Sequence, residues 1–315
     1  MRGPFWQSLL LLLAATLISV ADAICEEATP RVPRGDYLSH LFIAPTGRML
    51  PSGMVSVALG GAFASQGGKE YLGLISVGLG GVAEFEFSTA HVVTNVFNSS
   101  APIGTTSLKF LIYDSKAAGW FPDLVLALRS NRWSNVNGGA DDLTGPASPG
   151  GGSGVSQIDF ETHLTSLFLA ATSNPSPEIA LHYGIGLEEV RIRSLNYSGT
   201  NALSAPGNAR DNTISFFAGV ERTLNENTQS IIEVGGKPQI KFDKSLRSVK
   251  VEELWHIMGG VRFFVTRMIA LDAGLKYRSD YDGLSEIEIR SGLTVGIDLQ
   301  KSIVDNLKPR STKTK

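Results

Sequence analysis

Five histidines give this chain its widest choice of chemistry, and none has a partner at catalytic spacing. A nucleophilic serine needs a base within hydrogen-bond reach, and along one strand such neighbours stand two residues apart on one face. No histidine has a serine two residues on; His163 has Thr165, a weak substitute. The sequence therefore predicts hydrogen-bonded structural histidines and no catalytic residue. The five are His40, His91, His163, His182 and His256.

Patterns for metals, nucleotides and other cofactors are also missing. The single cysteine, Cys25, can form neither a Cys/His zinc set nor an intrachain disulfide, and the large Ile24 before it disfavours a lipid-bearing cysteine. Gly-Leu-Gly-Gly at 78–81 has no helical pattern after it, which excludes a phosphate-cradling loop. Asp141 and Asp142 are adjacent in a polar stretch, where carboxylates are usually solvated. We expect no metal and no cofactor.

The ionisable side chains that do form a pattern occupy the polar phase of otherwise apolar segments. A charge facing lipid costs about 2–4 kcal/mol at the bilayer midplane, so in a membrane barrel these side chains must point inward. Both signs occur, often in neighbouring segments, so that interior charges can pair. The candidates for lumen-facing charged or histidine side chains are Glu84, Glu86, Lys109, Arg129, Asp159, Glu161, His163, His182, Glu188, Glu221, Glu233, Lys237, His256, Arg262, Asp272, Lys276, Arg278, Glu286, Glu288 and Arg290.

The elements that position these side chains are strands, because the apolar residues alternate at period two and no long stretch keeps a helical period. Near the C-terminus, for example, Leu271, Ala273 and Leu275 alternate with Asp272 and Lys276. About twelve such segments occur. Their expected spans are 53–64, 71–79, 83–95, 105–113, 122–132, 156–172, 178–193, 213–223, 228–242, 252–265, 268–279 and 286–299. In the sixth span we expect Ile158, Phe160, Leu164 and Phe168 to face outward.

The connections between these segments alternate between short and long. Gly80-Gly81 and Thr266-Arg267 are among the short ones, whereas 134–155 and 194–212 are long and polar. A soluble sandwich has no reason to place every short turn at one end, but an outer-membrane barrel does. The sequence therefore predicts an all-β, membrane-spanning, antiparallel up-and-down barrel of about twelve strands. A soluble periplasmic β-protein remains the alternative fold.

The N-terminus predicts export. Arg2, an apolar run from Leu9 to Val20 and a small-residue site ending at Ala23 form a secretory signal peptide over residues 1–23. Residues 24–52 then form a polar periplasmic lead-in, 53–299 the barrel and 300–315 a basic C-terminal tail. The expected location is the outer membrane of a Gram-negative bacterium. A net charge of -2 excludes a strongly basic nucleic-acid binder.

Two passages resemble a family of small Gram-negative outer-membrane barrels. LFIAPTGRMLPSGMVSVAL at 41–59 is similar to the start of their first strand, and LGLISVGLGGVAEFEF at 72–87 to their next strand and tight turn. The resemblance is to the YjbH-like barrels linked to exopolysaccharide secretion and the MetA-type barrels of aromatic-degradation pathways. It covers about residues 41–299, and it implies a barrel fold more than a particular function. Arg290 to Ile297 also resembles the last-strand signal that barrel assembly machinery reads, although the strand ends on Leu299 rather than an aromatic residue.

These features predict a non-enzymatic outer-membrane barrel that is either a passive pore or an accessory of envelope polymer export. Its expected partners are membrane lipid, the barrel assembly machinery during insertion, and an envelope polymer or a small polar solute. A barrel enzyme acting on membrane lipids is the second hypothesis. An eight-stranded barrel is filled by side chains and a sixteen-stranded one carries water. Twelve strands therefore leave open whether this lumen is filled or a narrow pore.

Overall fold

Most of the residues that the structure describes lie in strands, and these strands belong to one sheet. The computed structural model describes residues 37–63, 70–89, 93–95, 103–115, 121–132, 134–139, 155–199, 209–243, 248–281, 283 and 286–301. The strands are β1 (Met54–Phe63), β2 (Glu70–Leu79), β3 (Ala83–Ser88), β4 (Val93–Asn95), β5 (Thr105–Tyr113), β6 (Asp123–Ser130), β7 (Ser134–Gly139), β8 (Val155–Ser176), β9 (Ile179–Gly199), β10 (Ala209–Asn225), β11 (Thr228–Asp243), β12 (Ser248–Thr266), β13 (Ile269–Arg278) and β14 (Glu288–Asp298).

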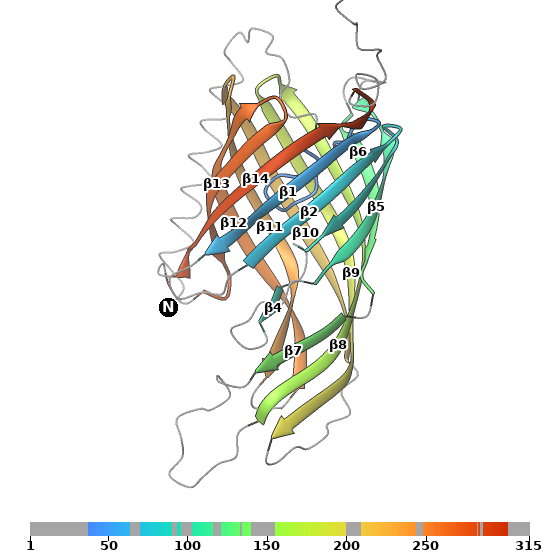
Figure 1. The fold of residues 1–315 in the computed structure, drawn as a ribbon, viewed down its shortest axis with the longest axis vertical. Coiled ribbons are helices and arrows are strands. Elements are labelled where there is room, and N and C mark those ends of the chain that lie inside the picture. Colours follow the sequence, from blue (N-terminus) through green and yellow to red (C-terminus); the bar gives the residue numbers. More distant parts are fainter. Residues whose placement is uncertain are drawn as a thin grey trace, which may run out of the picture.

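The sheet closes on itself. Its neighbours run in the order β10, β9, β8, β6, β5, β3, β2, β1, β14, β13, β12 and β11, and β10 also pairs with β11. The wall therefore has twelve positions, and each neighbouring pair in it is antiparallel (Figure 1). The predicted closed antiparallel barrel of twelve strands is confirmed.

Two short strands do not add positions to the wall. β7 pairs with β8 over Ser134–Gly139, next to the stretch of β8 that pairs with β6, so it continues the position of β6. β4 pairs in parallel with β11 at 239–241. The expected third strand, 83–95, is thus wrong beyond Ser88. The pairing of β10 with β11 ends at Gly235, which leaves that edge of β11 open for β4.

The connections alternate in length as the sequence predicts. At one end, short turns join β2 to β3, β8 to β9, β10 to β11 and β12 to β13 (top of Figure 1). The first has Gly80 and Gly81 at φ of 69° and 72°. Glycine adopts a positive φ without the steric cost that a Cβ would bring, so these two residues suit a tight turn. At the other end β8 and β9 extend far beyond β1 and β2.

Strand length explains this extension. β8 has 22 residues, or about 70 Å at the usual rise, whereas about 9–11 residues suffice to cross a bilayer at a tilt of ~45°. The strands from β8 to β12 therefore reach well outside the hydrocarbon layer on the side of the long connections. Among the described residues, no helix is long and apolar enough to cross a membrane.

The outer face of the wall is apolar and the inner face is largely polar. Leu59, Leu128, Leu187, Leu275 and Ile289 are each more than half exposed, whereas the residues beside them in the strands are turned inward. A continuous band of exposed apolar side chains has no reason to exist in water but matches a bilayer. The chain has the fold of outer-membrane β-barrels.

The predicted signal peptide, Cys25, His91, the Asp141–Asp142 pair and most of the basic tail lie outside the described residues. They stay predictions.

Candidate functional site

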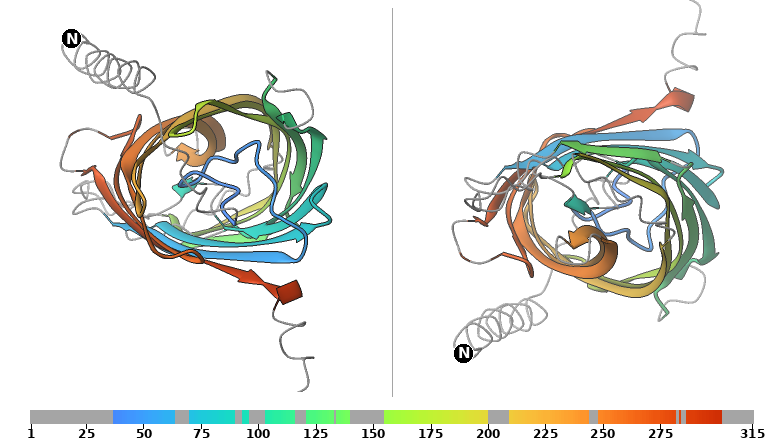
Figure 2. Two further views of the ribbon diagram at one scale, coloured as in Figure 1. Left: turned by 90° about the horizontal axis from the view of Figure 1, so that it is seen from above. Right: turned by 90° about the horizontal axis from the view of Figure 1, so that it is seen from below.

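A stretch of chain ahead of the first strand lies inside the barrel. Residues 37–50, here called the inner segment, loop through the lumen seen from above (Figure 2). Its residues from Tyr37 to Thr46 are all less than 9% exposed. The sequence places this stretch in a periplasmic lead-in, and that placement is wrong for residues 37–50. The apolar run Leu41-Phe42-Ile43-Ala44 is buried by the wall instead.

The inner segment is folded back on itself. The Leu41 amide donates to the Ala44 carbonyl at 2.9 Å, and the Thr46 amide donates to the Ser39 carbonyl at 3.0 Å. His40 and Pro45 form a bridge between the two arms. These contacts make a tight loop whose tip is Leu41–Ala44. The backbone groups of the tip that remain unpaired within the loop point at the wall.

Glu233 of β11 receives the tip. One of its carboxylate oxygens, Oε2, accepts hydrogen bonds from the amides of Phe42, Ile43 and Ala44 at 3.0, 3.0 and 3.1 Å. Its other oxygen lies 3.2 Å from Nε2 of His256. Successive amides that converge on one anion form a nest. Glu233 is fully buried, and the nest supplies hydrogen bonds that burial would otherwise remove.

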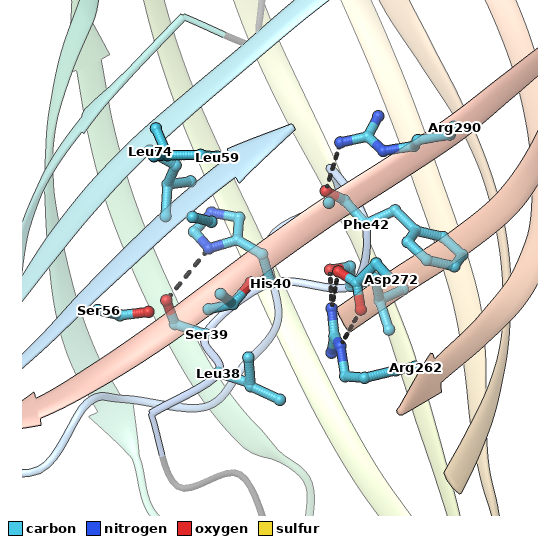
Figure 3. A pocket seen from close by; sticks show the side chains of 14 residues that line it. Leu38, Ser39, His40, Phe42, Ser56, Leu59, Leu74, Arg262, Asp272 and Arg290 are labelled. Atoms are coloured by element: carbon cyan, nitrogen blue, oxygen red, sulfur yellow. Dashed lines mark hydrogen bonds and ion pairs between the residues drawn. The ribbon is translucent and has the colours of Figure 1, made fainter. Parts of the chain in front are cut away.

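Two arginines of the wall hold the carbonyls of the same tip. Arg262 donates to the Leu41 carbonyl at 2.8 Å, and Arg290 donates to the Phe42 carbonyl at 3.1 Å (Figure 3). Asp272 fixes Arg262 from the neighbouring strand, with hydrogen bonds of 2.7 and 3.1 Å. Wall carboxylate and wall guanidinium groups thus bind opposite ends of the tip's peptide dipoles.

A second set of charged side chains on the wall binds the two arms of the loop. Nε2 of His40 lies 3.0 Å from Glu86, and Glu84 accepts hydrogen bonds from the Ser39 hydroxyl at 2.7 Å and the Leu50 amide at 3.1 Å. His40, Glu84 and Glu86 offer ligand atoms within 4.8 Å of one another, a donor set that a divalent cation accepts. The two carboxylates already have cations beside them, because Lys109 lies 3.7 Å from Glu84 and Arg129 lies 3.3 Å from Glu86.

The arm of the loop that leads to β1 is also held by side chains of the wall. Arg48 donates to Glu221 at 2.6 Å, and Glu221 also lies 3.4 Å from His182. The Gly47 amide donates to the Thr172 hydroxyl at 2.8 Å. The inner segment is therefore tied to strands on all sides of the lumen rather than to one neighbour.

Apolar packing and missing side chains complete the fit. The tip packs against Ile231 and Met258, which lie on the inner phase of their strands. A Cβ at Gly219 would lie 2.2 Å from Leu41 Cδ1, and one at Gly296 would lie 2.6 Å from Tyr37 Cγ. Glycine at these two positions leaves the space that the inner segment fills.

Most of the predicted lumen-facing residues point inward. Those that are buried on the inner face are Glu84, Glu86, Lys109, Arg129, His182, Glu221, Glu233, Lys237, His256, Arg262, Lys276, Arg278, Glu288 and Arg290. Glu188 and Asp272 are partly buried on the same face. Lys276 lies 3.1 Å from Glu288, and Glu286 precedes β14 rather than belonging to it.

The prediction is wrong for β8. Phe160, Leu164 and Phe168 are less than 5% exposed and face inward, so Glu161 and His163 lie on the outer phase. The physical reason is that part of the inner face is apolar: Phe168 packs with Val125, Ala127 and Met49 of the inner segment. Glu161 pairs with Arg193 on the outer side. The side chain of Asp159 lies outside the described residues.

Because His163 lies on the outer phase of β8, it is close to a serine on another strand, which spacing along one strand does not reveal. Nε2 of His163 lies 3.5 Å from Oγ of Ser130, on neighbouring strand β6. The serine hydroxyl donates instead to the Leu164 carbonyl at 3.1 Å. In this arrangement the proton that a base would have to take from the hydroxyl is directed at the backbone.

Sequence reasoning missed the inner segment and the wall residues that serve it. Arg48, Ser39 and Thr172 carry contacts that no strand pattern indicates. The apolar run at 41–44 inside a polar stretch, together with inward-phase Ile231 and Met258, was the available signal. Apolar residues that share a phase with buried charges need an apolar partner inside the lumen.

Comparison with known proteins identifies no family and no curated relative. Among solved structures, the chain is similar to the translocator domain of the autotransporter NalP from Neisseria meningitidis, with a TM-score of 0.47 and 12% identity over 90% of this chain and 94% of that one. The KdgM porin in complex with disordered oligogalacturonate has a TM-score of 0.38 and 7% identity, over 76% of this chain and 98% of that one. A Pseudomonas aeruginosa FadL homologue has a TM-score of 0.38 and 11% identity, over 86% of this chain and 100% of that one.

Space remains on both sides of the loop. One cavity lies between the inner segment and β1, β2, β12, β13 and β14 (Figure 3), and another between it and β6, β8, β9, β10, β11 and β12. Charged, polar and apolar side chains line both. At the level of the inner segment, the lumen therefore keeps room for small molecules, while the loop occupies its centre.

Proposed function

We propose that the protein is a non-enzymatic outer-membrane channel for small polar solutes whose bore is narrowed by its own inner segment. The observation that carries the proposal is the lumen itself. Its inner wall presents buried, paired charges of both signs, and the inner segment leaves small cavities beside it rather than an open bore. Mixed, paired charges favour weak selectivity for polar molecules over attraction of one ionic class.

This proposal includes the location and assembly of the protein. The apolar outer band and the alternation of connection lengths support residence in the outer membrane of a Gram-negative bacterium, reached after cleavage near Ala23 and insertion by the barrel assembly machinery. The resemblance to YjbH-like and MetA-type barrels supports the same placement. Export of an envelope polymer fits less well, because a polymer chain would have to pass the inner segment at the centre of the lumen.

Liposome swelling tests the proposal. Purified protein, folded into liposomes, should admit glycine and other small polar solutes and exclude a trisaccharide such as raffinose. Far-ultraviolet circular dichroism of the same vesicles shows that the barrel has formed. Swelling no faster than that of protein-free vesicles, for every solute and with a folded barrel, would contradict a channel function. Equal rates for glycine and raffinose would contradict the narrowing.

A further inference from the structure

The outer face of the wall changes from apolar to charged along the four neighbouring strands β6, β8, β9 and β10. Among the described side chains of this face, the last apolar row, here called the apolar row, consists of Leu128, Leu167, Leu187 and Ile214, which are paired across the strands and exposed. Two residues farther toward the long connections, the outward residues are Ser130, Thr165, Glu189 and Asn212. Two residues farther again, they are Arg132, His163, Arg191 and Arg210, here called the basic row.

The distance between the two rows places the basic row beside the lipid headgroups. Arg191 lies four residues beyond Leu187, which is about 13 Å along the strand and about 9 Å along the membrane normal at a tilt of ~45°. The headgroup layer on each side of the hydrocarbon core is about 5–7 Å thick, and a long arginine side chain at its outer edge reaches into it. The basic row lies at the end where β8 and β9 extend beyond β1 and β2 (Figure 1), which is the external side of a barrel with short periplasmic turns.

The basic row concentrates positive charge that needs anions. Arg191 is directly opposite both His163 and Arg210 in the register of the sheet, and like charges in such positions are destabilising. Glu189 supplies one carboxylate, which lies 2.9 Å from Arg191 and also pairs with Arg210. Each guanidinium has five N–H donors, so one carboxylate cannot accept from all the donors of two. The side chains of Arg191 and Arg210 stay 47% and 63% exposed, and further acceptors can therefore reach them from outside.

The surface around the basic row has an excess of positive charge. Arg132 is exposed beside the buried Asn131, and Arg193, one step beyond the row, pairs with Glu161. Of the side chains described on this face beyond the apolar row, four arginines thus stand beside two glutamates, a net charge of +2 with neutral histidine. The whole chain has a net charge of -2, so this surface differs in sign from the protein that carries it.

We propose that the basic row binds the phosphate groups of the lipid that surrounds the barrel in the outer leaflet. Arginine binds phosphate through two parallel hydrogen bonds, and the apolar row offers a surface for the acyl chains of the same lipid. Neighbouring positions of the basic row are about 5 Å apart, so the row can bind a lipid that carries more than one phosphate. The inference rests on the outer-membrane location included in the proposed function, and it does not depend on transport.

Native mass spectrometry of the folded protein in detergent micelles tests the site, with lipid A that carries two phosphates as the probe. The same lipid with both phosphates removed is the matched ligand, and inorganic phosphate is the matched free ion. We expect the phosphorylated lipid to bind at least about tenfold more tightly than the dephosphorylated one, the effect of one charge-assisted hydrogen bond. Inorganic phosphate at the same concentration should not displace it. Equal binding of the two lipids, or displacement by inorganic phosphate, would overturn the proposal.

Arginine variants locate the binding. Arg191→Gln combined with Arg210→Gln removes two exposed charges and should weaken binding of lipid A about tenfold or more. Arg267→Gln removes an exposed arginine at the opposite end of the barrel, in the short turn between β12 and β13, and should leave the affinity unchanged. Equal effects of the double variant and the control would contradict the site.

Glu189→Gln carries a prediction of opposite sign. This change removes the carboxylate that competes with a lipid phosphate for Arg191 and Arg210, so we expect lipid A to bind about threefold more tightly or better. Unchanged or weaker binding in this variant would contradict the site. The same measurement decides the matter if the double arginine variant fails to fold.

Binding and transport separate the two proposals. Preferential binding of phosphorylated lipid A without liposome swelling would support the lipid site and contradict the channel. Swelling without that preference would support the channel and contradict the lipid site.

Discussion

Glu233 shows how a fully buried carboxylate can be stable in the middle of the lumen. Removing an ion from water costs several kcal/mol even after relaxation, whereas each hydrogen bond to a charged group contributes about 1.5–3 kcal/mol. Glu233 accepts three backbone hydrogen bonds from the tip and has His256 beside its second oxygen. The carboxylate and the inner segment therefore depend on each other.

This dependence predicts the effect of a single substitution. Glu233→Ala leaves three buried amides without their acceptor, and we expect it to lower the free energy of unfolding by about 3–5 kcal/mol. Urea titration of the protein in lipid vesicles, followed by tryptophan fluorescence, measures the change. Glu226→Ala in the exposed turn between β10 and β11 is the control and should stay within about 0.5 kcal/mol. Equal effects of the two substitutions would show that the nest is not a stabilising contact.

The inner segment fits against β14 because Gly296 of that strand has no side chain. Gly296 stands against the ring of Tyr37. A glycine within a strand weakens the strand, so its presence here indicates close approach of another part of the chain. The contact is specific, because Gly259 on the outer face of β12 has open space around the position of a Cβ.

Gly296→Val should displace the inner segment, and Gly259→Val is its matched control. Both changes improve β-propensity, but the new side chain at 296 collides with Tyr37, and overpacking of this kind costs about 1–3 kcal/mol. We expect tryptic cleavage after Arg48 to become about tenfold faster in Gly296→Val. Mass spectrometry of the products measures this rate. Cleavage that is equally fast in the two variants would contradict the close fit of Tyr37.

The register of the wall is a second prediction at this scale. Single cysteines at Ala273 and Leu275 should be quenched by lipid-borne probes, and cysteines at Ser56 and Ser76, which are buried on the inner face, should not. The background is Cys25→Ser. An arginine in place of Leu275 should cost about 2–4 kcal/mol near the bilayer midplane. Similar quenching at all four positions would mean that the wall does not separate lipid from lumen.

How much of this could be predicted from the sequence depends on what the period-two pattern records. The pattern records two unlike faces, so it predicts the strands, the closure and the inward direction of residues such as Lys276. It assumes that every apolar residue faces lipid, and it therefore predicts the wrong face for Phe160 and Phe168. It also carries no information about chain that is not part of the wall, and so the inner segment, and every contact to it, needed the structure.

At the scale of the whole molecule, the barrel has an apolar outer face that suits lipid and a lumen that encloses the inner segment. The inner segment joins β1 at the end of the short turns, and its contacts reach β3, β5, β8, β10, β11, β12 and β14. Strands far apart in the sheet thus share one interior partner. The barrel and the inner segment should therefore act as one unit, in which the segment sets the width of the passage.

Single-channel conductance in planar bilayers tests this most directly, with the wild-type protein beside a variant that lacks residues 37–50. Removal of the inner segment leaves a twelve-stranded lumen, a size between filled barrels and water-filled ones, and we expect the conductance to rise by at least about threefold. Circular dichroism and heat-dependent mobility show that both barrels are folded. Equal conductance of the two folded proteins would contradict the claim that the inner segment narrows the channel.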